Sequence, residues 1–216
     1  MIQFDNVTVK HSDLRGIYDI SFDIESGKFV YLMGPTGAGK STIIKSILRS
    51  IGIDSGKIIV DGTNVSELSN SQLPYYRRNI GMIFQDFKLL DDRTIFENIS
   101  LPLQIIGLRK DDIEKKVNQV LNQIDLSKKY HNYPNELSGG EQQKVCVARA
   151  LVKEPKIILA DEPTGNLDPS ASDDIIDLLE KQTQIGTTVI MATHNYPLIE
   201  NRIKDFIEMN NGRVVV

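Results

Sequence analysis

The sequence predicts an α/β protein built around a largely parallel β-sheet. Three observations lead to this prediction: short apolar runs recur along the chain, stretches with helical spacing of apolar residues separate them, and Gly, Asn and Asp turns bound them. Apolar runs that alternate with helices are typical of parallel strands covered on both faces. A chain of 216 residues is long enough to form one domain with a well-buried core.

Strands dominate the first third of the chain. Apolar residues fall at largely alternate positions near the N-terminus, as on strands with one buried face, and Ser26-Gly27 supplies a turn before a continuous apolar run. From Ser41 the spacing becomes helical, and we expect this helix to end near Gly52. The predicted strands of the whole chain are residues 2–9, 20–24, 29–33, 58–60, 80–84, 157–160 and 187–192.

The strand pattern is absent between residues 87 and 155, where apolar residues recur with helical spacing behind the acidic pair Asp111-Asp112. We therefore expect an inserted helical subdomain, residues 87–155, between the two parts of a single core, residues 1–86 and 156–216. Residues 175–179 predict another helix, which Gly186 closes. Near the C-terminus, Asn211-Gly212 predicts a hairpin.

Composition narrows the classes of function. The formal net charge of −4 argues against a protein that binds nucleic acid by bulk electrostatics. One cysteine, Cys146, makes no internal disulfide and indicates a reducing compartment. No apolar run approaches the roughly 18 residues of a membrane span, and residues 1–10 do not resemble an export signal. We expect a cytoplasmic protein that would reach a membrane only through a partner.

A glycine-rich loop with the sequence Gly-Pro-Thr-Gly-Ala-Gly-Lys-Ser follows one predicted strand and opens a helix, the context of a phosphate-binding loop. Glycines let backbone N–H groups approach phosphate oxygens, the lysine neutralises the β- and γ-phosphates, and the serine hydroxyl can ligate Mg²⁺. The alternative is an ordinary glycine turn. The candidate nucleotide-binding residues are Gly34, Pro35, Thr36, Gly37, Ala38, Gly39, Lys40, Ser41 and Thr42.

Two acids, Asp161 and Glu162, end the apolar run of residues 157–160. The carboxyl end of a buried strand is where open α/β sheets bind ligands. Asp161 suits Mg²⁺, and Glu162 is placed to orient or deprotonate an attacking water. By itself such a pair is usually a solvated turn, but the phosphate loop favours the functional interpretation.

Gln85 and His194 also end predicted strands. Each could simply cap its strand, which for a lone histidine is the more common role. Parallel strands, however, deliver their carboxyl ends to one edge of a sheet. We therefore expect Lys40, Gln85, Asp161 and His194 to converge on one site.

Residues 137–143, Leu-Ser-Gly-Gly-Glu-Gln-Gln, precede another predicted helix. Ser138 and Glu141 form a capping-box pattern, and Gly139-Gly140 leaves backbone amides accessible to an anion. A plain helix start would explain the serine and glutamate but not the glycine pair. Because this loop lies in the helical region, it need not face the phosphate loop of its own chain.

Taken in order, these motifs resemble the ATP-binding cassette (ABC) ATPase family over essentially the whole chain. The resemblance implies a P-loop NTPase (RecA-like) core with an N-terminal antiparallel β subdomain and an inserted helical subdomain, and ATP and Mg²⁺ as ligands. It also implies an ATP-dependent head-to-tail homodimer. Each ATP would then lie between the phosphate loop of one protomer and Ser138, Gly139 and Gly140 of the other.

The resemblance further implies roles for single residues. Gln85, with Ser41 and Asp161, would contact Mg²⁺, and Gln85 would also sense the attacking water. His194 would contact the γ-phosphate, and Asp168 would couple the two sites across the dimer. The family usually stacks an aromatic residue on adenine. His11 holds the equivalent position here, with Tyr18 as the alternative.

Residues 73–86, 89–94 and 163–168 look like the cell-division members of the family. Lipoprotein-release and macrolide-export ATPases share the Pro-Thr-Gly-Asn-Leu-Asp stretch, whereas Asp92-Arg93-Thr94 favours cell division. The resemblance implies an integral membrane partner that controls cell-wall hydrolases. We expect it to dock near residues 86–106, where many apolar side chains either form an exposed groove or pack as a compact core.

Two other classes of protein fit less well. Cassette ATPases of DNA repair or translation need a long heptad insertion or a second cassette, and 216 residues hold neither. A P-loop nucleotide kinase would leave residues 137–143 without a purpose.

Overall fold

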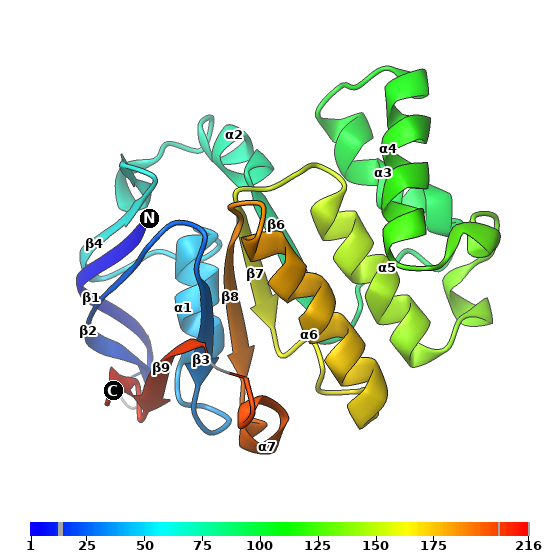
Figure 1. Ribbon diagram of the computed structural model, residues 1–216. Helices are drawn as coiled ribbons and strands as arrows, with labels where there is room; N and C mark the ends of the chain where they lie inside the picture. The colour runs from blue at the N-terminus through cyan, green and yellow to red at the C-terminus, as the bar shows by residue number, and fades with distance from the viewer. Residues whose placement is uncertain (13–14, 203, 216) are drawn as a thin grey trace.

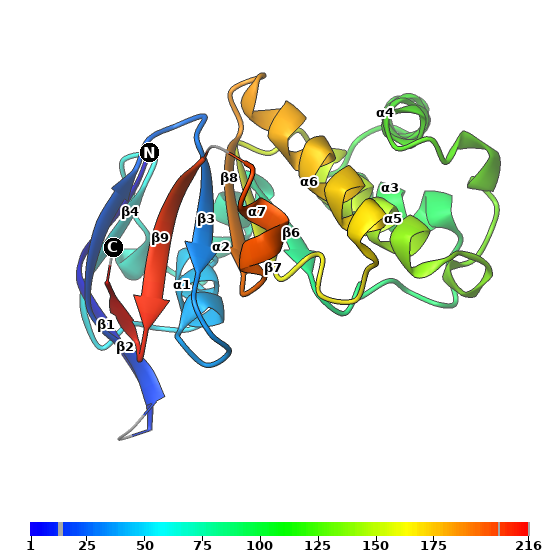
Figure 2. The same ribbon diagram turned by 60° about the horizontal axis from the view of Figure 1, so that its bottom comes forward.

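The computed structural model describes residues 1–12, 15–202 and 204–215 of the chain. Two β-sheets and a helical lobe lie side by side, with the smaller sheet and the helical lobe on opposite sides of the larger one (Figures 1 and 2). The predicted fold class is confirmed, because alternating strands and helices build a mostly parallel central sheet.

The smaller sheet is antiparallel, with the order β2-β1-β4-β5. Its first strand departs from strict alternation at Asn6, which has a backbone φ of 48° and lies at a register shift between Phe4 and Val7. Such a bulge lets both Phe4 and Val7 face the core although three positions separate them. The strands are β1 (Ile2–Ser12), β2 (Arg15–Ile24), β4 (Ser55–Val60) and β5 (Thr63–Asn64).

The central sheet has the order β10-β9-β3-β8-β7-β6. Five strands run parallel, and β10 returns antiparallel to β9 through the predicted Asn211-Gly212 hairpin. β3 and β8 are buried along their whole length, as expected for strands covered on both faces. The strands are β3 (Phe29–Met33), β6 (Ile80–Phe84), β7 (Ile157–Asp161), β8 (Thr188–Thr193), β9 (Asp205–Asn210) and β10 (Arg213–Val214).

Helix α1 (Lys40–Ile47) packs between the two sheets, with Ile43, Ile44 and Ile47 fully buried in one apolar cluster. The prediction that this helix ends near Gly52 is wrong. Arg49 adopts the left-handed conformation, with a φ of 55°. Ser50 N–H then donates to the Lys45 carbonyl and Arg49 N–H to the Ser46 carbonyl, a closing motif that stops the helix at Ile47.

The other face of the central sheet carries α6 (Pro169–Thr183), and a lobe of α3 (Ile95–Ile105), α4 (Lys110–Gln123) and α5 (Gly139–Leu151) continues from it. The buried apolar residues of these helices pack against the central sheet and form a second apolar cluster, separate from the one around α1. Ile95, Ile99 and Leu103 of α3 belong to that cluster, whereas Leu90 and Ile105 are exposed. The apolar residues near 86–106 therefore divide between core and surface.

Two short helices, α2 (Leu73–Arg78) and α7 (Tyr196–Ile199), complete the structure. The apolar pattern did not predict α2, α3 or α7. α2 has no buried residue, so it leaves no apolar periodicity to read. None of the helices within the described residues combines the length and apolar character that crossing a membrane requires.

Candidate functional site

The loop after β3 is shaped by its glycines. Gly34 has a φ of +140°, and a Cβ at this position would lie 2.2 Å from the Met209 carbonyl oxygen, so only glycine fits there. Gly39 caps the N-terminus of α1 with a φ of 107°. The buried strand β3 thus turns directly into α1, whose first backbone N–H groups point toward the loop.

Lys40 lies inside this loop, with only 4% of its side chain exposed. Its Nζ donates hydrogen bonds to the carbonyl oxygens of Gly34 (2.7 Å) and Pro35 (3.1 Å). The same ammonium lies 3.3 Å from Oε1 of Glu162. The loop carbonyls and Glu162 hold this charge at the place where a phosphate group would sit.

Ser41 and Asp161 form a second polar pair beside the loop. The Ser41 hydroxyl donates to Oδ1 of Asp161 at 2.9 Å, at the carboxyl end of β7. Burial raises the pKa of Asp161, although the hydrogen bond from Ser41 partly opposes this shift. A partly buried carboxylate beside a hydroxyl gains from a cation that replaces its lost hydration.

Glu162 bridges two of the predicted site residues. Its Oε1 faces Lys40, and its Oε2 contacts Nδ1 of His194, which follows β8. Glu162 has a backbone φ of 51°, in the left-handed region, where the chain turns sharply after β7. The carboxylate of Glu162 therefore lies between a cation and an imidazole at the edge of the sheet.

These residues line one cavity of about 1000 Å³. As predicted, Lys40, Gln85, Asp161 and His194 meet there, since the strands before them end at the same edge of the sheet. Gly34 and Ala38 are buried behind the loop and shape it without lining the cavity. The lining residues are His11, Gly16, Thr36, Gly37, Gly39, Lys40, Ser41, Thr42, Lys45, Phe84, Gln85, Asp86, Lys88, Asp161, Glu162 and His194.

The residues of the cavity fit a nucleoside triphosphate with magnesium. Mg²⁺ prefers oxygen ligands and usually takes only one or two from the protein, with water and phosphate oxygens supplying the rest. Ser41, Asp161 and Gln85 offer such oxygens in one place. Among the described residues, no group of three or more His, Cys, Asp or Glu could hold a metal ion alone. A metal here therefore needs ligands from its substrate.

His11 lies at one end of this cavity and contacts the phosphate-loop helix: its Nε2 is 3.1 Å from Oγ1 of Thr42. The alternative base platform, Tyr18, instead lies beneath the Arg213 guanidinium, 5.9 Å from the ring centroid, and is not part of the cavity lining. Of the two, only His11 lines the cavity.

If His11 stacks on adenine, His11→Tyr should preserve or tighten ATP binding, because a phenol ring offers a larger stacking face. His11→Ala should weaken binding by about 1 kcal/mol, roughly fivefold in Kd. Equilibrium titration with a fluorescent ATP analogue measures both. Equal Kd values for the three proteins would show that the base binds elsewhere.

Two predicted nucleotide-contacting segments lie outside the cavity. Ser138 caps α5 by accepting a hydrogen bond from Glu141 N–H, while the Glu141 carboxylate accepts one from Ser138 N–H, which is the predicted capping box. Ser138 and Gly139 are exposed. Asp168 caps α6 through Ala171 N–H and is also exposed.

Three residues near the site were not predicted from the sequence. Lys45, one helical turn after Ser41, lines the cavity, and its charge favours ionisation of Asp161; the i,i+4 spacing could have suggested it. Gln143 is fully buried in α5 and donates to the Pro163 carbonyl at 2.7 Å. Asn166 donates to the Gln85 carbonyl at 3.3 Å. Gln143 and Asn166 belong to the stretches 137–143 and 163–168 that the sequence singles out, but those patterns do not reveal these hydrogen bonds, because the acceptors are distant backbone atoms.

Comparison with known proteins agrees with this geometry. The family model for ABC transporters matches residues 17–165. A relative named cell division ATP-binding protein FtsE, from Streptococcus pneumoniae, is 44% identical, and the alignment covers 99% of this chain and 90% of that protein.

Solved structures give the same family. The dimeric structure of MJ0796, described as a bacterial ABC transporter cassette, has a TM-score of 0.89 and 34% identity, and the alignment covers 100% of this chain and 97% of that one. A second structure of the same cassette is a dimer in a post-hydrolysis state bound to ADP and Pi, with a TM-score of 0.88, 34% identity and the same coverage. The chain is therefore an ATP-binding cassette ATPase of the ABC transporter family, and it belongs with the cell-division members of that family.

Proposed function

We propose that two copies of this chain bind Mg²⁺-ATP between them, hydrolyse it, and use the resulting opening and closing to drive an FtsX-like membrane partner that controls cell-wall hydrolysis during division. The observation that supports this most strongly is the convergence of Lys40, Ser41, Asp161, Glu162 and His194 on one cavity. The names of the relatives support the assignment to cell division.

In this proposal the loop amides and Lys40 bind the β- and γ-phosphates of ATP. Ser41, Asp161 and Gln85 hold the magnesium ion, which neutralises charge on the phosphate oxygens when it is bound. In the free chain the Lys40 ammonium is held by two loop carbonyls and by Glu162, so an arriving phosphate takes the place of one of these partners.

Glu162 orients and deprotonates the attacking water. Its carboxylate lies between Lys40 and His194, the two residues proposed to contact the γ-phosphate. His194 contacts the γ-phosphate from the end of β8 and fixes the direction of the Glu162 carboxylate. A base that is both oriented and close to the reacting phosphate is what water activation requires.

The second copy completes the site. Ser138, Gly139 and Gly140 lie at an exposed helix N-terminus outside the cavity of their own chain, and a helix N-terminus attracts phosphate. Head-to-tail pairing would bring this N-terminus to the ATP of the partner, and Asp168 would lie at the interface to couple the two sites. The dimeric form of the related cassettes supports this arrangement.

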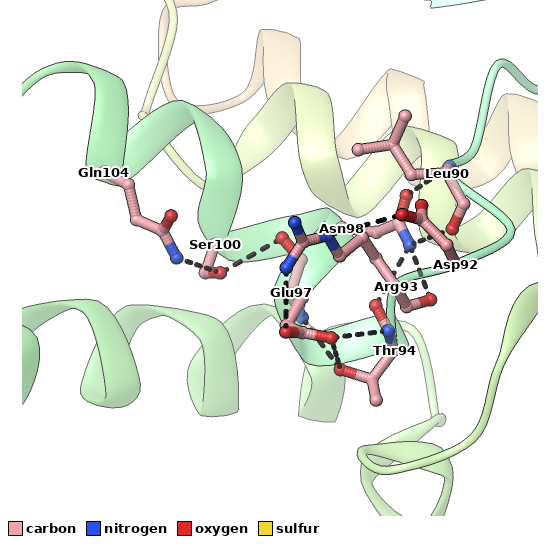
Figure 3. Close-up of polar contacts among 8 residues, drawn as sticks. All are labelled: Leu90, Asp92, Arg93, Thr94, Glu97, Asn98, Ser100 and Gln104. Atoms are coloured by element: carbon pink, nitrogen blue, oxygen red, sulfur yellow. Dashed lines mark hydrogen bonds and ion pairs between the residues drawn. The ribbon is translucent and has the colours of Figure 1, made fainter.

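The membrane partner is proposed to dock at residues 86–106, at the inner face of the cell membrane. Buried Asn98 braces the loop before α3 (Figure 3): its Oδ1 accepts from Leu90 N–H, and its Nδ2 donates to the carbonyls of Leu90, Arg93 and Thr94. Thr94 and Glu97 add a capping box. These hydrogen bonds hold the loop that carries the exposed Leu90. Ile105, at the C-terminal end of α3, is also exposed.

The docking proposal predicts that Ile105→Glu reduces capture of the membrane partner by tenfold or more, because a charge replaces an apolar contact that is 68% exposed in the free chain. Ile185→Glu is the matched control, since Ile185 is 77% exposed but lies after α6. Tagged protein is purified from detergent-solubilised membranes, and the captured permease is identified by mass spectrometry. Equal capture by both variants would contradict the proposed surface, and an exporter permease in place of an FtsX-like protein would contradict the division role.

A further inference from the structure

Residues 85–88, called here the Gln85 segment, leave β6 and lead toward the helical lobe. Phe87 and Lys88 have φ values of 57° and 53°, in the left-handed region that residues other than glycine adopt only under strain. Two such residues in succession persist only where the surrounding structure restrains them. Neighbouring elements must therefore hold the Gln85 segment in place.

The restraint comes mainly from α5. Arg149 donates from Nη2 to the Phe87 carbonyl at 2.9 Å and from Nη1 to the Lys88 carbonyl at 2.6 Å. The Cys146 thiol donates to the same Phe87 carbonyl at 3.0 Å. A planar guanidinium can bond two adjacent carbonyls at once, a geometry that the point charge of lysine does not reproduce. Arg149 thus fixes both left-handed residues together.

The opposite end of α5 also meets this segment. A Cβ at Gly139 would lie 3.9 Å from Cζ of Phe87, so the phenyl ring packs close to the exposed start of the helix. Ser138 and Arg149 are about 16 Å apart along one rigid helix. Both ends of α5 therefore contact the Gln85 segment, Gly139 by packing and Arg149 by hydrogen bonds.

A second element, the loop before α6, holds Gln85 from the other side. Asn166 donates to the Gln85 carbonyl at 3.3 Å. A Cβ at Gly165 would lie only 2.9 Å from Nε2 of Gln85, so glycine leaves the space that the Gln85 amide occupies. The position of Gln85 at the cavity therefore depends on two other segments of the chain.

We propose that Arg149 is a positioning residue for Gln85: by holding the Phe87 and Lys88 carbonyls, it connects α5 to the Gln85 segment and keeps the Gln85 amide at the cavity. This inference rests on the proposed role of Gln85 at the magnesium ion and the attacking water.

Arg149→Lys tests the connection while keeping the positive charge. We expect kcat for ATP hydrolysis to fall about tenfold and KM for ATP to stay within about twofold, because Lys40 and the phosphate loop are untouched. Within residues 86–90 of the nucleotide-free chain, the hydrogen-bonded amides, those of Lys88 and Leu90, should exchange hydrogen with solvent about tenfold faster. This second readout does not depend on activity.

Lys153→Met is the matched control. Lys153 lies just after α5, and its Nζ donates a hydrogen bond to the Arg77 carbonyl at 3.0 Å. Lys153→Met therefore also removes a hydrogen bond from a side chain to a distant backbone carbonyl. It should leave the exchange of residues 86–90 unchanged. Circular dichroism and thermal unfolding show that both variants fold. Unchanged exchange of these amides in Arg149→Lys would overturn the inference.

A double-mutant cycle separates this inference from the role proposed for Gln85. If Arg149 acts through Gln85, Arg149→Lys has no further effect on kcat once Gln85→Ala is present. Multiplicative losses would overturn the positioning role of Arg149 and leave that of Gln85 standing. Wild-type turnover by Gln85→Ala would overturn both.

Discussion

Glu162→Gln is expected to lower the rate of ATP hydrolysis by about 100- to 10,000-fold while ATP still binds. Glutamine keeps the size of the side chain, but its amide cannot accept a proton from water at neutral pH. The loss should appear in kcat, because the interaction is made with the attacking water rather than with ground-state ATP.

Binding is expected to persist or to tighten in this variant. The Glu162 carboxylate lies 3.3 Å from the Lys40 ammonium, where its negative charge would also face the γ-phosphate. Removing that charge relieves repulsion and leaves Lys40 free to bind phosphate.

Phosphate release measures hydrolysis, and equilibrium titration measures ATP affinity. Glu154→Gln is the control, because Glu154 forms an exposed ion pair with Lys116 away from the cavity. Turnover within about threefold of wild type would contradict the role of Glu162 and would make His194 the next candidate base.

Lys40→Ala is expected to weaken ATP binding by about 100-fold or more. A hydrogen bond to a charged group contributes about 1.5–3 kcal/mol, and Lys40 is placed to make such bonds to two phosphate groups. The change also leaves Glu162 without its cation, so that a carboxylate would then face the triphosphate.

Equilibrium titration at constant Mg²⁺ checks this expectation. Lys28→Ala serves as the control, since Lys28 is half exposed and pairs with Asp205. Circular dichroism tests whether Lys40→Ala still folds, because the loop loses two hydrogen bonds to Lys40. Wild-type ATP affinity in a folded Lys40→Ala protein would contradict the assignment of the loop.

The fold and the convergence of the site could be predicted because short-range patterns determine them. A buried parallel strand needs a continuous apolar run, and its carboxyl end then places residues such as Asp161 and His194 at one edge. The Ser138 capping box also depends only on residues three positions apart. That same pattern at Thr94 and Glu97 would have predicted the start of α3.

The rest could not be predicted because it depends on distant contacts. Arg149 and Gln143 donate to backbone carbonyls 62 and 20 residues away, and a carbonyl is present at every position of the sequence. The early end of α1 follows from a left-handed Arg49, a conformation for which glycine is the usual signal. Long-range hydrogen bonds and unusual backbone angles thus escape a reading based on residue types alone.

In the proposed dimer, ATP joins two copies of this chain through Ser138, Gly139 and Gly140. Replacing Ser138 with arginine places a long side chain at the exposed N-terminus of α5, where it would fill the space needed by the second copy. Ser71→Arg is the matched control, because Ser71 is also exposed but lies before α2. Losing the Ser138 cap costs about 1 kcal/mol of helix stability, which thermal unfolding would register.

Sedimentation velocity with Mg²⁺-ATP measures this pairing. In the Glu162→Gln background we expect a shift from monomer to dimer when Mg²⁺-ATP is added, with or without Ser71→Arg. Adding Ser138→Arg should keep the protein monomeric while ATP affinity stays within a few-fold, since the phosphate loop of each chain is intact. A Glu162→Gln, Ser138→Arg protein that still dimerises with ATP would contradict the proposed sandwich.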